Sequence, residues 1–165
     1  MSDFSKLGAI MLVLLLTPFL TIKAIQTYRL DPAIIYNALA GKSISQIDAA
    51  LQLLNESASS QKQAYEGALT MKKAGLLSKP KDKLQTFKAG RKKLEAAIAS
   101  DPGNIEYRFL RVLIQENAPK ILKYKNDLET DSALIRASFK KLSQVVQQAV
   151  KDYSYTSKVL NNIES

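Results

Sequence analysis

The chain has 165 residues, of which 46% are hydrophobic and 24% are charged, a composition typical of a globular domain with a hydrophobic core. It contains no His, Cys or Trp. The absence of Cys excludes disulfides, thiolate nucleophiles and Cys-ligated metals, and the absence of His removes the usual general base near neutral pH. The formal net charge of +9 suits nucleic acid, an anionic membrane or an acidic partner, or simply keeps the protein soluble.

The N-terminal segment has the features of a signal peptide. Lys6 and the α-amino group precede an apolar run from Leu7 to Ile22, and the small residue Ala24 follows it. The run contains Pro18 and is shorter than the about 20 apolar residues that span a bilayer as a helix. We therefore predict a signal peptide over residues 1–24 and an exported protein, periplasmic or extracellular. An uncleaved membrane anchor is the alternative.

Residues 25–165 are predicted to form a single all-α domain. Apolar residues recur at helical spacing in several independent segments, and no alternating strand pattern of useful length is present. The first helix is expected to start at Asp31-Pro32, because Asp is a common N-cap and Pro is favoured at the first helical position, and to end at Gly41. Ser45 is expected to cap the second helix.

The middle of the chain is predicted to contain two longer helices. The first passes through Tyr65 and ends near Ala74, and a loop from Gly75 to Pro80 follows it. The second is predicted from Lys81 to Ser100 and has one strongly basic face. Its buried stripe is expected to consist of Leu84, Phe87, Leu94, Ala97 and Ile98.

A sharp stop separates this helix from the next. The residues Asp-Pro-Gly-Asn at 101–104 are expected to end this helix and to precede the start of the next one. The following helix is predicted over residues 105–117. Pro119 then begins a short helical turn, in which we expect Ile121 and Leu122 to be buried.

The C-terminal part is predicted to be one long helix. Residues 126–130 have the composition of a connection, and Asp131 or Ser132 is expected to cap the helix that follows. Its periodic apolar residues are Leu134, Ile135, Phe139, Leu142, Val145, Val146, Ala149 and Val150. From Tyr153 onward, the tail is expected either to extend this helix or to fray.

Residues 90–107 resemble the end of a tetratricopeptide repeat and the start of the next helix. In that family a small residue, a large apolar residue, an Ala and a Pro follow one another at fixed offsets, and those positions are here Gly90, Leu94, Ala97 and Pro102. The resemblance implies a bundle of stacked antiparallel helix pairs, although no second full repeat is evident. Residues 106–111, together with Asn117-Ala-Pro119, are also similar to small exported bacterial proteins of unknown function.

The densest charged feature surrounds the helix predicted at 81–100. Its basic residues, opposed only by Asp82, are Lys72, Lys73, Lys79, Lys81, Lys83, Lys88, Arg91, Lys92 and Lys93. They suit phosphates or an acidic partner, or they form a solvated helix face. Nucleic acid is not expected, because stacking aromatics are not interleaved and the protein is predicted to be exported. Membrane contact is expected only through the N-terminal segment before cleavage, because the apolar face of this helix is needed for the core.

A second charged cluster lies on the helix predicted at 105–117. Arg108 and Arg111 could clamp a carboxylate or a phosphate, and the alternative is pairing within the helix or with a facing helix. The candidate binding residues are Lys88, Arg91, Lys92, Glu106, Arg108, Arg111 and Asn117.

No catalytic residue, metal ligand or cofactor is predicted. The acidic residues Asp127, Glu129 and Asp131 lack the Gly and the distal Glu of a calcium loop, and no phosphate loop, zinc motif or nucleophilic Ser motif is present. The expected function is a non-enzymatic helical module that binds another protein. The alternatives are a small-molecule or anion binder that uses the basic helix with Arg108 and Arg111, and a hydrolase that uses carboxylates alone.

Overall fold

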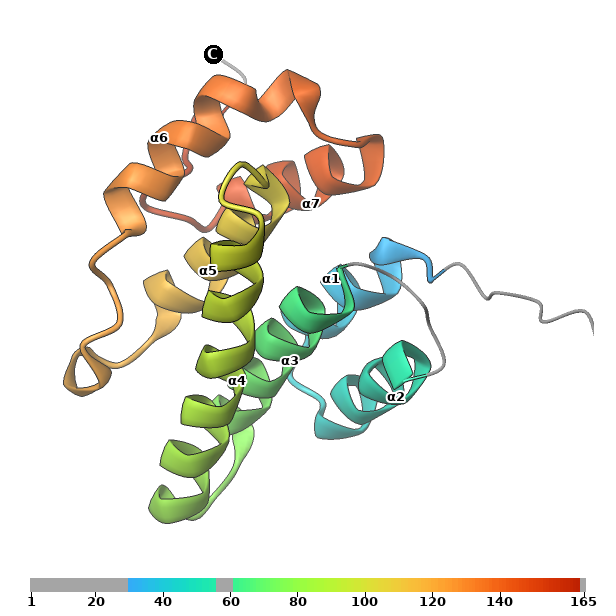
Figure 1. The fold of residues 1–165 in the computed structure, drawn as a ribbon, viewed down its shortest axis with the longest axis vertical. Helices are drawn as coiled ribbons and strands as arrows, with labels where there is room; N and C mark the ends of the chain where they lie inside the picture. Colours follow the sequence, from blue (N-terminus) through green and yellow to red (C-terminus); the bar gives the residue numbers. More distant parts are fainter. Residues whose placement is uncertain (1–29, 56–60, 164–165) are drawn as a thin grey trace, which may run out of the picture.

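The computed structural model describes residues 30–55 and 61–163, so the predicted signal peptide over 1–24 lies outside the described residues. Within these ranges the protein is all-helical and contains no strand (Figure 1), which confirms the all-α prediction. None of the described helices is both long and apolar enough to cross a membrane. The α-helices and the 3-10 helices, in chain order, are α1 (Pro32–Ala40), α2 (Ile44–Asn55), α3 (Lys62–Leu76), α4 (Pro80–Ser100), α5 (Ile105–Asn117), η1 (Lys120–Leu122), α6 (Leu128–Ser138), η2 (Phe139–Lys141) and α7 (Gln144–Ser154).

Capping residues explain where several helices begin. Asp31 caps α1 as predicted, since its Oδ1 accepts a hydrogen bond of 2.9 Å from the amide of Ala33. Asn104 caps α5 in the same way. At α2 the predicted cap was wrong by two residues, because the hydroxyl of Ser43, and not that of Ser45, accepts from the amide of Gln46 at 3.3 Å.

Helices α3 and α4 form an antiparallel pair at the centre of the fold (Figure 1). The predicted loop from Gly75 to Pro80 is shorter than expected: Gly75 still belongs to α3, and Pro80 is the first residue of α4. The two backbones touch where the helices cross. A Cβ atom added to Gly67 would lie 2.9 Å from the carbonyl oxygen of Gly90, and one added to Gly90 would lie 2.7 Å from that of Gly67. This approach requires glycine on both helices.

The core lies around α3. Helices α1 and α2 pack against α3, α5 packs against both α3 and α4, and α6 and α7 pack against α5. Three aromatic rings connect the first, fifth and seventh helices, because the ring of Phe109 lies 5.7 Å from that of Tyr36 and 6.2 Å from that of Tyr153. Helices α1, α5 and α7 therefore share one continuous core.

Two residues that were predicted to be buried are exposed. Leu84 retains 43% of its accessible surface. It belongs to the first turns of α4, and this end of the α3–α4 pair extends past the other helices (Figure 1). Ile121 is 87% exposed, and Leu122 is half-buried. The core position next to η1 is taken by Tyr124, which is buried and packs edge-on against Phe87 with 5.6 Å between the ring centroids.

The predicted long C-terminal helix is two helices. Helix α6 begins before Asp131 and Ser132, so neither residue is a cap, and both are buried inside the helix. The chain breaks after η2, and the hydroxyl of Ser143 accepts from the amide of Val146 to start α7. Because α7 folds back at this break, the apolar faces of both α6 and α7 reach the core (Figure 1).

Candidate functional site

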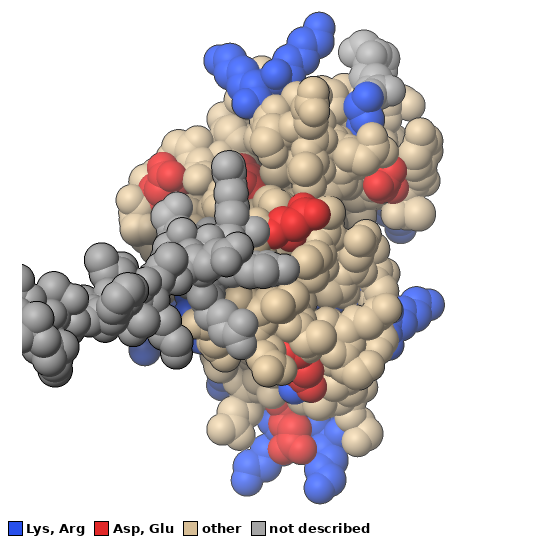
Figure 2. Space-filling model, turned by 90° about the vertical axis from the view of Figure 1, so that its right-hand side faces the viewer, with Lys and Arg blue, Asp and Glu red and all other residues tan. Residues whose placement is uncertain are grey.

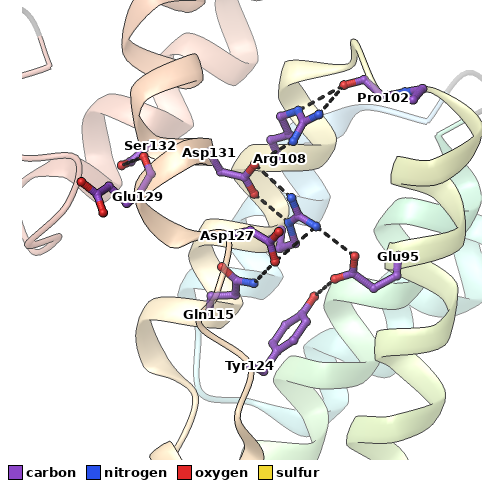
Figure 3. Close-up of polar contacts among 10 residues, drawn as sticks. Glu95, Pro102, Arg108, Gln115, Tyr124, Asp127, Glu129, Asp131 and Ser132 are labelled. Atoms are coloured by element: carbon purple, nitrogen blue, oxygen red, sulfur yellow. Dashed lines mark hydrogen bonds and ion pairs between the residues drawn. The ribbon is translucent and has the colours of Figure 1, made fainter.

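Arg108 and Arg111, which were predicted as anion anchors, both bind Asp131. Figure 3 shows Arg108 and Asp131 in this cluster. The Asp131 side chain is fully buried in α6, and three hydrogen bonds reach it from α5. Arg111 binds it with both Nε and Nη2, at 2.7 and 3.0 Å, and Arg108 binds it with Nη1 at 2.8 Å. A bidentate guanidinium–carboxylate pair is a strong and directional contact, so this ion pair holds α6 against α5.

The remaining amino group of Arg111 joins α5 to α4. Its Nη1 binds Glu95 at 2.9 Å, and the hydroxyl of Tyr124 donates to the other oxygen of Glu95 (Figure 3). Burial by itself would lower the pKa of Arg111, but Asp131, Glu95 and Asp127 outweigh it and raise the pKa. Arg111 therefore stays charged and paired.

The remaining nitrogens of Arg108 are also occupied. Both Nε and Nη2 donate to the backbone carbonyl of Pro102, at 3.1 and 2.6 Å, and so hold the turn between α4 and α5 (Figure 3). Every nitrogen of the two guanidinium groups thus has an acceptor within the protein. An external anion would have to displace Asp131, Glu95 or this carbonyl to bind here.

Gln115 also belongs to the buried polar cluster around Arg111, and it was not identified from the sequence. It is fully buried, and its Nε2 donates to Asp127 at 3.2 Å. Among the described residues, its Oε1 is the one buried side-chain nitrogen or oxygen without a hydrogen-bond partner. The atom faces the interior of the protein and does not line either of the depressions described below.

Glu106 forms a second buried cluster, which joins α1, α3 and α5. The hydroxyls of Tyr36 and Tyr65 both donate to its Oε1, and the Nε2 of Gln61 donates to its Oε2 at 3.3 Å. Burial and the neighbouring carboxylate raise the pKa of both tyrosines, which therefore stay protonated and act as donors. Glu106 thus acts as an acceptor for two buried hydroxyls.

A surface depression of ≈ 470 Å³ opens beside Glu106. Three separate parts of the chain form it, namely the start of α3, the turn before α5 and the junction between α6 and α7. Its lining combines apolar and polar side chains and consists of Gln61, Gly103, Asn104, Ile105, Glu106, Ser138, Lys141, Leu142, Ser143 and Val146.

Glu116 organises the C-terminal tail, which neither extends α7 beyond Ser154 nor frays within the described residues. Its carboxylate accepts hydrogen bonds from the hydroxyls of Tyr153 and Ser157, at 2.9 and 2.7 Å, and from the amide of Lys158. These contacts lead the chain back to the core, where Leu160 is fully buried. A second depression, of ≈ 390 Å³, lies beside Glu116.

The hydrogen bonds at Glu116 predict a pH-dependent stability. Burial by itself would raise the pKa of Glu116, but the hydrogen bonds from Ser157, Lys158 and Tyr153 outweigh it and hold the pKa below its ordinary value of 4.5. A carboxylate with a lowered pKa stabilises the fold fully above its unfolded pKa, and this contribution is lost as the pH falls through the folded pKa. The contribution is therefore present near neutral pH and disappears in acid.

The Glu116→Gln variant tests this prediction. We expect it to lower the free energy of unfolding by about 1 kcal/mol at about pH 7, at the low end for charged hydrogen bonds because the carboxylate is partly exposed. The difference in free energy of unfolding between the variant and the wild-type protein should be smaller at about pH 3, as measured by urea unfolding at both pH values. Glu129→Gln, the same change at an exposed glutamate, is the control and should show no such difference. A difference at Glu116 that is equal at both pH values would contradict the assignment.

The seven candidate residues do not form one site. Lys88 and Lys92 are exposed on α4, and the guanidinium of Arg91 lies 4.6 Å from the centroid of the Tyr124 ring. Asn117 donates to the carbonyl of Leu113 and to the hydroxyl of Tyr153. The other three residues, Glu106, Arg108 and Arg111, belong to the two buried clusters.

Within the described ranges, no group of acidic side chains is arranged to hold a metal ion. Comparisons of the chain with models of protein families, with curated proteins and with solved structures find no match. The function must therefore be inferred from the residues and their geometry.

Proposed function

We propose that this protein is an exported, non-enzymatic helical module that binds a segment of another protein in the depression beside Glu106. The observation that carries the proposal is the composition of this depression. Ile105, Leu142 and Val146 provide apolar contact, while Asn104 and Lys141 provide polar contact at the same opening. Apolar walls with a few polar groups are typical of sites that recognise side chains.

The hydrogen bonds that the carboxylates of Glu106 and Glu116 accept support a non-enzymatic role. A hydrolase that uses carboxylates alone needs two acids facing one cleft, one of them free to exchange a proton. Each of the two depressions contains one glutamate, Glu106 or Glu116, and each of these carboxylates accepts several hydrogen bonds from within the protein. The paired state of Arg108 and Arg111 likewise speaks against the alternative of an anion binder.

The α3–α4 pair supports the proposed likeness to a tetratricopeptide unit. The two helices are antiparallel, and Gly90, Leu94 and Ala97 are buried on the side of α4 that faces α3. Pro102 stands in the turn that follows α4. We propose one such helix pair, extended by other helices, and not a repeating array.

Site-specific crosslinking tests the proposed protein-binding role. A photoreactive amino acid is placed at Lys141, on the rim of the depression, in the full chain expressed in a bacterial host that carries the natural partners. The control position is Lys140, which is also exposed in η2 but does not line the depression. We expect a discrete adduct from position 141 and none from position 140. No adduct at 141, or the same adducts at both positions, would refute the proposal.

The proposed export is tested separately, by fractionation and N-terminal sequencing. A protein that starts at Ile25 in the soluble envelope fraction is the expected result. A protein that starts at Met1 in the membrane fraction would show a retained anchor instead, because the run from Leu7 to Ile22 would then not have been removed.

A further inference from the structure

The outward face and the N-terminal end of α4 carry exposed lysines without acidic partners. Five lysines form no ion pair with any described residue, and they are Lys79, Lys81, Lys83, Lys88 and Lys92. The positions of Lys81, Lys88 and Lys92 differ by seven and four residues, which places them along one face of the helix. Lys79 precedes the helix, and Lys83 lies on the opposite side of its first turns, so these two lysines surround the exposed N-terminal end of α4. We call these five lysines, together with the exposed Leu84, the α4 basic surface.

Acidic side chains nearby do not neutralise this surface. Glu66 on α3 pairs with Lys93 at 2.7 Å, and Glu95 on α4 pairs with Arg111. Among the described acids of α3 and α4, this leaves Asp82 alone without an ion pair. The α4 basic surface therefore keeps an excess of positive charge that is available to an external anionic partner.

The shape of the region suits a broad partner. The α3–α4 pair forms the lower extremity of the molecule in Figure 1, and Figure 2 shows basic side chains that project from this end, with acidic atoms between them. Neither of the two depressions includes a residue of α4. The surface thus projects outward and is able to meet a flat partner without interference from the other helices.

Leu84 adds an apolar group to this surface. From the sequence, Leu84 was expected to be buried, so that no apolar side chain of this helix would be available to a membrane. In the structure Leu84 keeps 43% of its accessible surface, and lysines flank it in the chain. Leu76 and Leu77, at the end of the same helix pair, are half-buried. An exposed leucine surrounded by lysines is suited to the boundary between lipid headgroups and acyl chains.

The residue types favour lipid over a protein or a nucleic acid. Recognition of fixed carboxylates or phosphates commonly uses the planar fork of arginine, whereas lysine acts as a flexible point charge. The one arginine of α4, Arg91, lies over the ring of Tyr124 at 4.6 Å, so the cations of α4 without a partner among the described residues are lysines. Single-stranded nucleic acid would require exposed aromatic rings, and the one aromatic residue of α4, Phe87, is buried.

We infer that the α4 basic surface binds an anionic lipid bilayer, with Leu84 entering the interface and the lysines facing the phosphate headgroups. This contact uses α4, whereas the proposed protein-binding depression uses the start of α3, the turn before α5 and the α6–α7 junction. The two contacts are therefore separable by mutation.

Vesicle sedimentation with the full chain tests the inference. The vesicles contain either phosphatidylcholine with phosphatidylglycerol or phosphatidylcholine alone, and the readout is the ratio of the two affinities. The apolar run at residues 7–22 is the same in all variants and affects both vesicle types, so the ratio isolates the effect of charge. We expect the wild-type chain to prefer the anionic vesicles and this preference to weaken as salt is added.

Charge reversal at the free end of α4 is the main variant. Lys79→Glu, Lys81→Glu and Lys83→Glu together should lower the affinity ratio by about 100-fold or more, since each lysine near an anionic surface contributes about fivefold. Glutamate is favoured at the start of a helix, so the variant should keep its fold, which circular dichroism checks. The matched control changes the same net charge at exposed lysines elsewhere and consists of Lys120→Glu, Lys123→Glu and Lys140→Glu.

Leu84→Ser distinguishes a bilayer from a soluble polyanion. It should weaken binding to anionic vesicles by about fivefold and leave binding to polyglutamate unchanged. The inference is overturned if the wild-type chain shows no preference for anionic vesicles, or if the two triple variants lose equal affinity. It is also overturned if Leu84→Ser has no effect on vesicle binding, since the surface would then bind acidic macromolecules through charge alone.

Discussion

Replacing Asp131 by alanine is expected to lower the free energy of unfolding by about 3 to 5 kcal/mol, which is a large part of the about 5 to 15 kcal/mol that stabilises a typical domain. The variant loses the acceptor of three hydrogen bonds from Arg108 and Arg111. It also leaves the buried guanidinium of Arg111 with Glu95 as its main counter-charge. Urea unfolding, followed by circular dichroism, measures the loss.

Asp48→Ala is the matched control for this prediction. Asp48 pairs with Lys73 at 2.6 Å, a distance close to those at Asp131, but about half of its side-chain surface is exposed. Exposed ion pairs contribute between about 0 and 1 kcal/mol, so the control should cost little. The two ion pairs have similar distances and differ in exposure, so the comparison isolates the effect of burial on their contribution to stability. If the two variants lose similar stability, the Asp131 ion pair does not hold α6 in the way that its geometry indicates.

Sequence reasoning succeeded where a local signal determines the structure. Asp31 caps α1, as predicted, because its own side chain accepts a hydrogen bond from the amide two residues away. The C-terminal break has a local signal in the N-cap Ser143, but the prediction missed it because Phe139, Leu142 and Val146 continue a helical period and neither Gly nor Pro interrupts it. The break depends on whether α6 and α7 can both reach the core, which is a tertiary effect.

The partners of the buried polar side chains could not be predicted from the sequence either. The charge density on α5 drew attention to Glu106, Arg108 and Arg111, but their partners depend on packing. The Tyr36 hydroxyl that bonds to Glu106 is 70 positions away in the chain, and Asp131 is 20 positions from Arg111. Helical periodicity predicts which face of a helix is buried, and it does not specify which side chain of another helix will meet that face.

Gly67→Ala is expected to destabilise the protein by about 2 kcal/mol or more, through a clash at the crossing of α3 and α4. The new Cβ would lie 2.5 Å from the amide nitrogen of Leu94 and 2.9 Å from the carbonyl oxygen of Gly90. Both are backbone atoms that cannot rotate away, so the helices must separate and the contacts of Tyr65 and Leu69 with the core must loosen. This cost exceeds the gain of about 1 kcal/mol that alanine brings to a helix.

Gly75→Ala is the control within the same helix, and the expected sign is opposite. No atom outside the local helix lies within 4 Å of a Cβ added there, so alanine should stabilise α3 by about 0.5 to 1 kcal/mol. Adding Gly90→Ala to Gly67→Ala should cost less than the sum of the two single variants, because the first substitution already separates the helices that the second would push apart. Additive losses, or a stabilising Gly67→Ala, would show that the two backbones are not in contact. Thermal and urea unfolding of the four variants decide between these outcomes.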